Sequence, residues 1–178
     1  VAARGRGDVY KRQPEGSYCG ARSTDPIACA PGGFSNASGL DACFECDAGT
    51  FQPSPNATAC DACEPGGWCG AGASAVTLCD AGTHRSATGG ASADDCTPCD
   101  PGHACAKGAV NRTACKPGSA SSDGVTCVDC VVGEFQNAPG ASSCVRCHAG
   151  KFCPRGASRE LAPSCKEGTF ADALDESG

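Results

Sequence analysis

Large apolar side chains stand singly along this chain, separated by short runs of small and polar residues. The most regular apolar position is an aromatic ring two residues after a glycine, in the pattern Cys-x-x-Gly-x-Phe. The pattern occurs at Cys29–Phe34, Cys46–Phe51, Cys130–Phe135 and Cys165–Phe170. A glycine in this position suits a tight turn that leads into a short strand. The pattern therefore predicts short β-hairpins and no helix of consequence, with at most one weak turn each at 71–76 and 157–161.

The chain has too little apolar surface to fold around an ordinary core. Val, Ile, Leu, Phe and Trp make up only 21 of 178 residues, and most of the 40% hydrophobic content is Ala and Cys. Ordering a residue costs about 1–2 kcal/mol, whereas a disulfide that closes a loop of about 15 residues contributes roughly 3 kcal/mol. With 18 cysteines, we expect a small disulfide-rich fold, an elongated tandem array of short β-hairpin cysteine-rich modules with little or no helix.

The cysteine spacing repeats along the chain. Cys60, Cys63, Cys69 and Cys79 recur 36 positions later as Cys96, Cys99, Cys105 and Cys115. A short unit has the spacing C-x2-C-x13-C-x2-C, and a long unit inserts C-x5-C-x9-C. The predicted units are 14–45 (long, truncated), 46–62 (short), 63–98 (long), 99–129 (long), 130–146 (short) and 147–178 (long, truncated). Such a stacked array predicts that each unit contacts only its neighbours.

The first thirteen residues interrupt this pattern. Residues 8–13 look like a translated sequencing adapter, and Gln13 stands where the repeat calls for a cysteine. We therefore set 1–13 apart as a non-native segment, and with it the integrin-type tripeptide Arg6-Gly7-Asp8. Because this segment holds four basic residues and one acidic residue, its removal changes the net charge from −6 to −9. An acidic chain of this kind is not expected to bind nucleic acid through a basic patch.

The sequence alone does not determine how the cysteines pair. Pairing neighbours in order gives Cys29–Cys43, Cys46–Cys60, Cys63–Cys69, Cys79–Cys96, Cys99–Cys105, Cys115–Cys127, Cys130–Cys144 and Cys147–Cys153. It leaves Cys19 and Cys165 unpaired by truncation, since the partner of Cys19 would be residue 13 and that of Cys165 would follow Gly178. A crossed pattern with Cys60–Cys69 or Cys63–Cys79 is the alternative.

From residue 14 onward, the Cys-x-x-Gly-x-Phe pattern followed by Cys-x-x-Cys resembles the ephrin-receptor-like cysteine-rich repeat. It is also similar to growth-factor-receptor, tumour-necrosis-factor-receptor and EGF-like cysteine-rich modules. The resemblance implies a rod of disulfide-bonded modules of a type found in receptors, secreted matrix proteins and large protist surface proteins. The additional cysteines of the long units depart from the short repeat, so the resemblance does not define their fold.

The cysteine content also indicates a location. Disulfides persist in the secretory pathway and outside the cell, and the glycosylation sequons at Asn36, Asn56 and Asn111 agree with that location. The chain shows neither a signal peptide nor an apolar run approaching 18 residues. We therefore expect an interior fragment of an extracellular or cell-surface protein, which would meet a membrane only through other parts of the polypeptide.

Zinc is the main chemical alternative. Cys43, Cys46, Cys60 and Cys63 have the spacing of a four-thiolate structural site, as do Cys127, Cys130, Cys144 and Cys147. Against zinc, the ten cysteines outside these two sets would remain without a site, eight of them as scattered thiols at Cys19, Cys29, Cys69, Cys79, Cys105, Cys115, Cys153 and Cys165. A thioredoxin-like exchange site would need a βαβ context that the sequence lacks, and the dispersed acidic residues match no EF-hand loop. We expect no metal and no cofactor.

The remaining candidate residues point to structure rather than catalysis. His84 and His103 fall at or beside the aromatic position of a turn, and His148 follows Cys147, so none has an evident nucleophile to activate. Trp68 and Phe44 are the best candidates for a contact surface, with packing against disulfides as the simpler role. We expect a non-enzymatic structural spacer or adhesion stalk with an unknown protein or glycan partner; the alternatives are a ligand-binding receptor ectodomain and an intracellular zinc-binding array.

Overall fold

The structure, a computed structural model, describes residues 13–20, 23 and 25–162. Within them every strand is two residues long. The strands are β1 (Ser17–Tyr18), β2 (Ile27–Ala28), β3 (Gly33–Phe34), β4 (Phe44–Glu45), β5 (Thr50–Phe51), β6 (Asp61–Ala62), β7 (Gly67–Trp68), β8 (Thr77–Leu78), β9 (Thr83–His84), β10 (Thr97–Pro98), β11 (His103–Ala104), β12 (Thr113–Ala114), β13 (Ser119–Ala120), β14 (Val128–Asp129), β15 (Glu134–Phe135) and β16 (Val145–Arg146). The copy of the turn pattern at Cys165–Phe170 lies outside the described residues.

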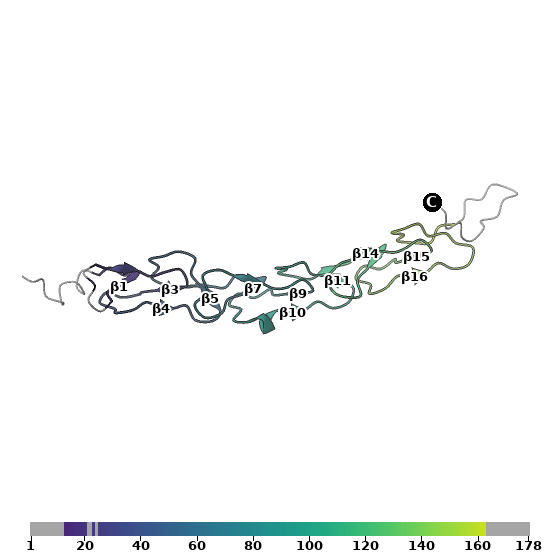
Figure 1. Ribbon diagram of the computed structural model, residues 1–178. Coiled ribbons are helices and arrows are strands. Elements are labelled where there is room, and N and C mark those ends of the chain that lie inside the picture. Colours follow the sequence, from purple (N-terminus) through teal and green to yellow (C-terminus); the bar gives the residue numbers. More distant parts are fainter. Residues whose placement is uncertain (1–12, 21–22, 24, 163–178) are drawn as a thin grey trace, which may run out of the picture. The chain divides into compact units, whose positions relative to one another are not determined.

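Each odd-numbered strand pairs with the strand that follows it, so the described chain contains eight two-stranded sheets (Figure 1). The β3–β4 pair is antiparallel and places Phe34 opposite Phe44. In the β15–β16 pair, Phe135 lies opposite Val145 in the same way. The predicted fold class, a disulfide-rich array of tandem β-hairpins with almost no helix, is confirmed.

A tight turn precedes the first strand of each hairpin, and its geometry explains the recurring glycine. Before β3, the N–H of Gly33 donates to the carbonyl of Ala30 at 3.0 Å, with Pro31 and Gly32 at the turn's centre. Gly32 has a φ of +86°. Proline at the second position and a positive-φ glycine at the third are the signature of a type II turn. The Cys-x-x-Gly-x-Phe pattern thus encodes a turn that directs the chain into the strand.

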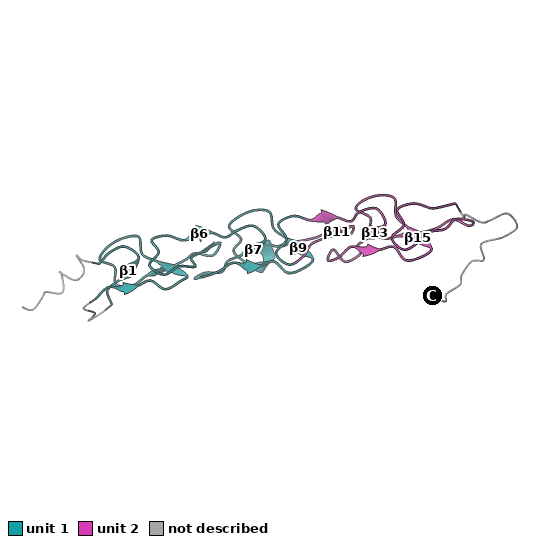
Figure 2. Cartoon of the chain, turned by 90° about the horizontal axis from the view of Figure 1, so that it is seen from above, with its two compact units in different colours: residues 1–97, 107–111 teal, residues 98–106, 112–178 magenta. Residues whose placement is uncertain are grey.

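The hairpins are grouped into two compact units, 1–97 with 107–111 and 98–106 with 112–178 (Figure 2). In the first unit, the predicted long unit 14–45 contains two hairpins, β1–β2 and β3–β4, whereas the short unit 46–62 contains only β5–β6. The hairpin is therefore the elementary module, and the additional cysteines of a long unit belong to a second hairpin.

Successive hairpins are joined by backbone hydrogen bonds. In the first unit, three such bonds join β3–β4 to β5–β6: from Gly32 N–H to Gln52 C=O (2.8 Å), from Asn56 N–H to Cys29 C=O (3.0 Å) and from Ser35 N–H to Ala57 C=O (3.0 Å). In the second unit, β13–β14 and β15–β16 are joined in the same way, from Gly118 to Gln136 (2.7 Å), Gly140 to Cys115 (2.8 Å) and Ser121 to Ala141 (3.1 Å). These bonds satisfy peptide groups that two-residue strands leave unpaired.

The turn glycines also meet a more distant hairpin. A Cβ atom placed on Gly32 would lie 2.2 Å from the carbonyl oxygen of Gly72, which belongs to the loop between β7 and β8. One whole hairpin, β5–β6, separates the two residues along the chain. The prediction that each unit contacts only its neighbours is therefore wrong, because residue 32 in unit 14–45 reaches residue 72 in unit 63–98.

Most of the buried apolar side chains are cysteines. Of the thirteen buried apolar residues described, eleven are cysteines and the other two are Ala120 and Ala157. The large apolar side chains lie outside instead, with Phe44 at 49% exposure and Val132 at 68%. The disulfides thus occupy the place that Leu, Ile and Phe take in an ordinary core.

A single-turn 3-10 helix, η1 (Ala93–Asp95), lies in the long loop between β9 and β10. The turn pattern of the sequence did not predict this helix. The Asp95 carboxylate accepts the backbone N–H groups of Ala91 (2.7 Å) and Ser92 (3.1 Å). A Ser-x-x-acid spacing such as Ser92 to Asp95 is the recognisable signal for such a helix start. No helix in the described part of the chain has the length and apolarity needed to cross a membrane.

We predict that Gly32→Ala destabilises the protein more than Gly133→Ala. Both glycines have a φ of +86°, so each substitution carries the same left-handed backbone cost of about 1–2 kcal/mol. Among the described residues, no atom lies within 4 Å of a Cβ added to Gly133, whereas Gly32 faces the Gly72 carbonyl. The crowding adds about 1–3 kcal/mol, measurable as a lower urea midpoint. Equal losses in the two variants would contradict the second-neighbour contact.

Candidate functional site

The disulfide framework is the dominant chemical feature. Within the described residues, eight disulfides join Cys29–Cys43, Cys46–Cys60, Cys63–Cys69, Cys79–Cys96, Cys99–Cys105, Cys115–Cys127, Cys130–Cys144 and Cys147–Cys153. These are the eight pairs of the in-order scheme. Their Cα–Cα separations lie between 5.5 and 6.4 Å, within the range usual for disulfides.

The bridges fall into two classes. Five span 12 to 17 residues and enclose the first strand of a hairpin together with the loop that follows it, as Cys46–Cys60 encloses β5 and its loop. Three span only six residues and close a turn with its first strand, as Cys63–Cys69 does around β7. Every described hairpin that is closed by a six-residue bridge belongs to a predicted long unit.

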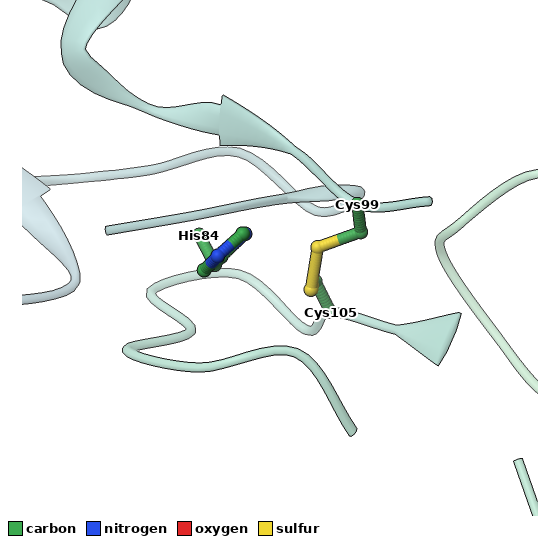
Figure 3. Close-up of side chains that lie close together, drawn as sticks. All are labelled: His84, Cys99 and Cys105. Atoms are coloured by element: carbon green, nitrogen blue, oxygen red, sulfur yellow. A yellow bond between two sulfur atoms is a disulfide. The ribbon is translucent and has the colours of Figure 1, made fainter. Parts of the chain in front are cut away.

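The cysteines with zinc spacing do not gather into a four-thiolate cluster. In the first set, Cys43 pairs with Cys29 and Cys63 pairs with Cys69, both outside the set. Only Cys46 and Cys60 pair with each other. The second set is divided in the same way. Figure 3 shows the sulfur–sulfur bond of Cys99–Cys105, in which neither sulfur is available as a thiolate ligand. This framework fits an oxidising environment better than a metal site.

Cys19 is the free cysteine of the described residues, and it is buried at 1% exposure. Cys165, the other cysteine predicted to be unpaired, lies outside the described residues. Burial keeps the Cys19 thiol away from reagents and partner proteins in the folded state.

The three histidines are structural in their surroundings. The Nδ1 atom of His84 lies 3.2 Å from the Thr97 carbonyl oxygen, and His103 is half-buried in β11. His148 is exposed and its Nδ1 lies 2.6 Å from Glu160 Oε1, which also accepts the His148 backbone N–H at 2.7 Å. That backbone bond, with the neighbouring ring, lowers the pKa of Glu160.

The loop between β9 and β10 is fixed by Arg85 and Asp95. The Arg85 guanidinium donates to the carbonyls of Asp95 (3.2 Å) and Thr88 (3.1 Å) and lies 3.8 Å from the Asp95 carboxylate. The N–H groups of Ala91 and Ser92, and then the Arg85 charge, lower the pKa of Asp95. The carboxylate is thus committed to its own loop, a role that composition did not reveal.

Asp123 has the same task in the loop between β13 and β14. Its carboxylate accepts the N–H groups of Val125 (2.9 Å) and Thr126 (3.3 Å), which lower its pKa. The Ser121 hydroxyl lies 3.2 Å from the same carboxylate. The carboxylates of Asp95 and Asp123 therefore each stabilise the loop that contains them.

All three sequon asparagines, Asn36, Asn56 and Asn111, are exposed. Asn56 has a φ of +59°, a conformation that Asn tolerates better than most residues. Its backbone N–H binds Cys29, so the backbone at this sequon is fixed while the side chain faces solvent.

One groove on the first unit contains the aromatic residue predicted for contact. It has a volume of about 390 Å³ and is lined by Tyr18, Pro31, Phe44 and Glu45 among others. The Phe44 ring lies 5.6 Å from that of Phe34, tilted by 39°, so one ring supports the other while Phe44 stays half exposed. Trp68, the other predicted contact residue, is half-buried in β7 and does not line this groove.

Comparison with known proteins identifies no family. No protein-family model matches the chain, and no curated protein is similar to it at a significant level. The resemblance to ephrin-receptor-like repeats therefore stays a prediction, whereas the disulfide-rich hairpin array is shown by the structure itself.

We predict that Asp95→Asn lowers the melting temperature at neutral pH and that this difference shrinks in acid. A carboxyl with a depressed pKa in the folded state contributes stability above its unfolded pKa of about 3.9, and the contribution is lost as the pH falls through the folded value. Melting curves between pH 7 and pH 2 test this, with Asp94→Asn as the control of equal charge. A difference that stays constant below pH 3 would contradict the role assigned to the charge.

Proposed function

We propose that this chain is part of an extracellular or cell-surface protein and acts there as a stiff, glycosylated spacer or adhesion stalk. The observation that carries the proposal is the core, which is made of disulfides and leaves the large apolar side chains outside. Such a core resists opening where disulfides persist. The proposed partner is a protein or glycan, and no residue is assigned a catalytic role.

The connections between hairpins support a mechanical role. Two or three backbone hydrogen bonds at each step, together with the contact between Gly32 and Gly72, restrict bending within a unit. Because these connections use backbone atoms and glycines, the exposed loop side chains stay free for glycans or partners. A stalk needs this combination of fixed backbone and variable surface.

We predict that deleting 46–62 shortens the molecule by one hairpin and leaves it folded. The deletion removes the complete Cys46–Cys60 loop and joins Glu45 to Cys63, so the cysteine pattern continues. Small-angle X-ray scattering of protein secreted behind a heterologous signal peptide should give an elongated particle whose maximum dimension falls by one step. Deleting 53–69 is the control of equal length, because it removes three cysteines and leaves Cys46 without its partner. This variant should not fold.

A compact particle whose dimension does not follow the number of hairpins would overturn the spacer proposal. The zinc-binding alternative makes the opposite chemical prediction, since it needs free thiols and bound metal. Thiol titration and metal analysis of the same sample separate the two readings.

The alternative of a ligand-binding ectodomain has one specific feature in its favour, the groove at Phe44. Exposed aromatic rings beside the Glu45 carboxylate suit a cationic side chain, which an aromatic face and a negative charge both attract. The chain's net charge of −6 also favours a basic partner. We propose an arginine-bearing peptide as the ligand class.

We predict that an acetylated Gly-Arg-Gly-Arg-Gly peptide binds to this groove. Phe44→Ala and Glu45→Gln should each weaken binding about three- to tenfold, the effect of losing a cation–π or charge contact. Glu64→Gln is the control, because Glu64 is exposed but does not line the groove. If all three substitutions weaken binding equally, the attraction is a general effect of charge and the groove is not a site.

A further inference from the structure

Gln13 is buried, and its side-chain amide is not fully hydrogen-bonded. The residue is 2% exposed, and its Nε2 donates to the Ser17 carbonyl. Its Oε1 is also buried and has no hydrogen-bond partner. A buried amide oxygen without a partner is unfavourable, so the surroundings of residue 13 are not those that a glutamine requires.

A free thiol lies six residues further along, in the same hairpin. Cys19 is 1% exposed and is the unpaired cysteine of the described residues. Three disulfides elsewhere have this same separation of six, with Cα–Cα distances of 5.8, 6.4 and 6.3 Å. In those hairpins the first cysteine occupies the position that Gln13 holds here.

The backbone around Gln13 matches that of two hairpins with a six-residue bridge, β7–β8 and β11–β12. The turn glycines Gly16, Gly66 and Gly102 have φ values of +80°, +83° and +88°. Each accepts, at 2.9 Å, the N–H of the cysteine that follows its hairpin; these cysteines are Cys29, Cys79 and Cys115.

The second cysteine position matches as well. Cys19 donates its N–H to Leu40 in the next hairpin, as Cys69 does to Gly90 and Cys105 does to Gly124, at 3.0, 2.8 and 3.1 Å. Hairpins without a six-residue bridge make the same two bonds, from Cys46 N–H to Gly32 C=O (2.9 Å) and from Ser35 N–H to Ala57 C=O (3.0 Å). β1–β2 therefore has the common hairpin backbone, and the cysteine at position 19 is what places it with the hairpins that have a six-residue bridge.

We propose that position 13 is the site of a ninth disulfide, with Cys19 as its partner, and that glutamine occupies a place shaped for a half-cystine. This inference does not depend on the proposed spacer function. A bridge between residues 13 and 19 would close the turn and first strand of β1–β2, as Cys63–Cys69 does in β7–β8.

The bridge would form by ordinary thiol–disulfide exchange with glutathione disulfide as the oxidant. The Cys19 thiolate attacks one glutathione sulfur and releases a glutathione thiolate. The introduced thiolate then attacks the Cys19 sulfur of the mixed disulfide and releases the second one. The two protein thiols lose two protons and two electrons, and one glutathione disulfide becomes two glutathione thiols.

The test is Gln13→Cys in a Cys165→Ser background, refolded with a glutathione redox buffer. The parent should contain one free thiol and the variant none, and peptide mapping should join residue 13 to Cys19. The variant should also unfold at a higher urea concentration. Gln13→Ser is the matched control, because it removes the misplaced amide but leaves one free thiol.

Two free thiols in Gln13→Cys, a disulfide-linked dimer, or a bridge from residue 13 to any other cysteine would overturn the proposal. If Gln13→Cys fails to fold, the parent decides the question through its reactivity. Cys19 should react with Ellman's reagent slowly in the native state and rapidly in guanidinium, and equal rates would show that the position is not enclosed.

Discussion

The sulfur–sulfur bond is the interaction on which every other part of this structure depends. In most domains the interior forms because many apolar side chains leave water together. Here eleven of the thirteen buried apolar residues are cysteines, and each bridge acts by limiting the freedom of the unfolded chain. Because the core is covalent, Phe44 and Val132 are not needed inside it and lie at the surface.

The second requirement is backbone satisfaction. Strands of two residues leave most peptide groups without a partner inside the sheet, and those groups must find one elsewhere. The bonds from Gly32 to Gln52 and from Gly118 to Gln136 solve this by passing from one hairpin to the next. Stability within a unit therefore comes from two separate sources. Disulfides close each hairpin, and hydrogen bonds between peptide groups connect each hairpin to the next.

Much of the fold could be predicted because its determinants are local. The Cys-x-x-Gly-x-Phe pattern indicated the turn at Gly32, and the cysteine spacing indicated hairpins whose eight bridges join neighbours in order. The contact from Gly32 to Gly72 could not be predicted, because it joins two glycines without side chains and depends on how consecutive hairpins are rotated. The loop held by Arg85 and Asp95 was missed for another reason. The Arg85 guanidinium binds backbone carbonyls, and every residue type has a backbone carbonyl, so the amino-acid sequence does not identify these partners.

The contact between second neighbours has a consequence for the order of events during synthesis. Both cysteines of Cys29–Cys43 leave the ribosome within 14 residues of each other, so this bridge can close early. Gly32, however, meets its carbonyl partner only after about 40 further residues have been made. A growing chain of this type can therefore carry, at its newest end, two hairpins whose bridges have closed but whose turn glycines still lack their carbonyl contacts, so that complete packing proceeds from the amino terminus and lags behind translation.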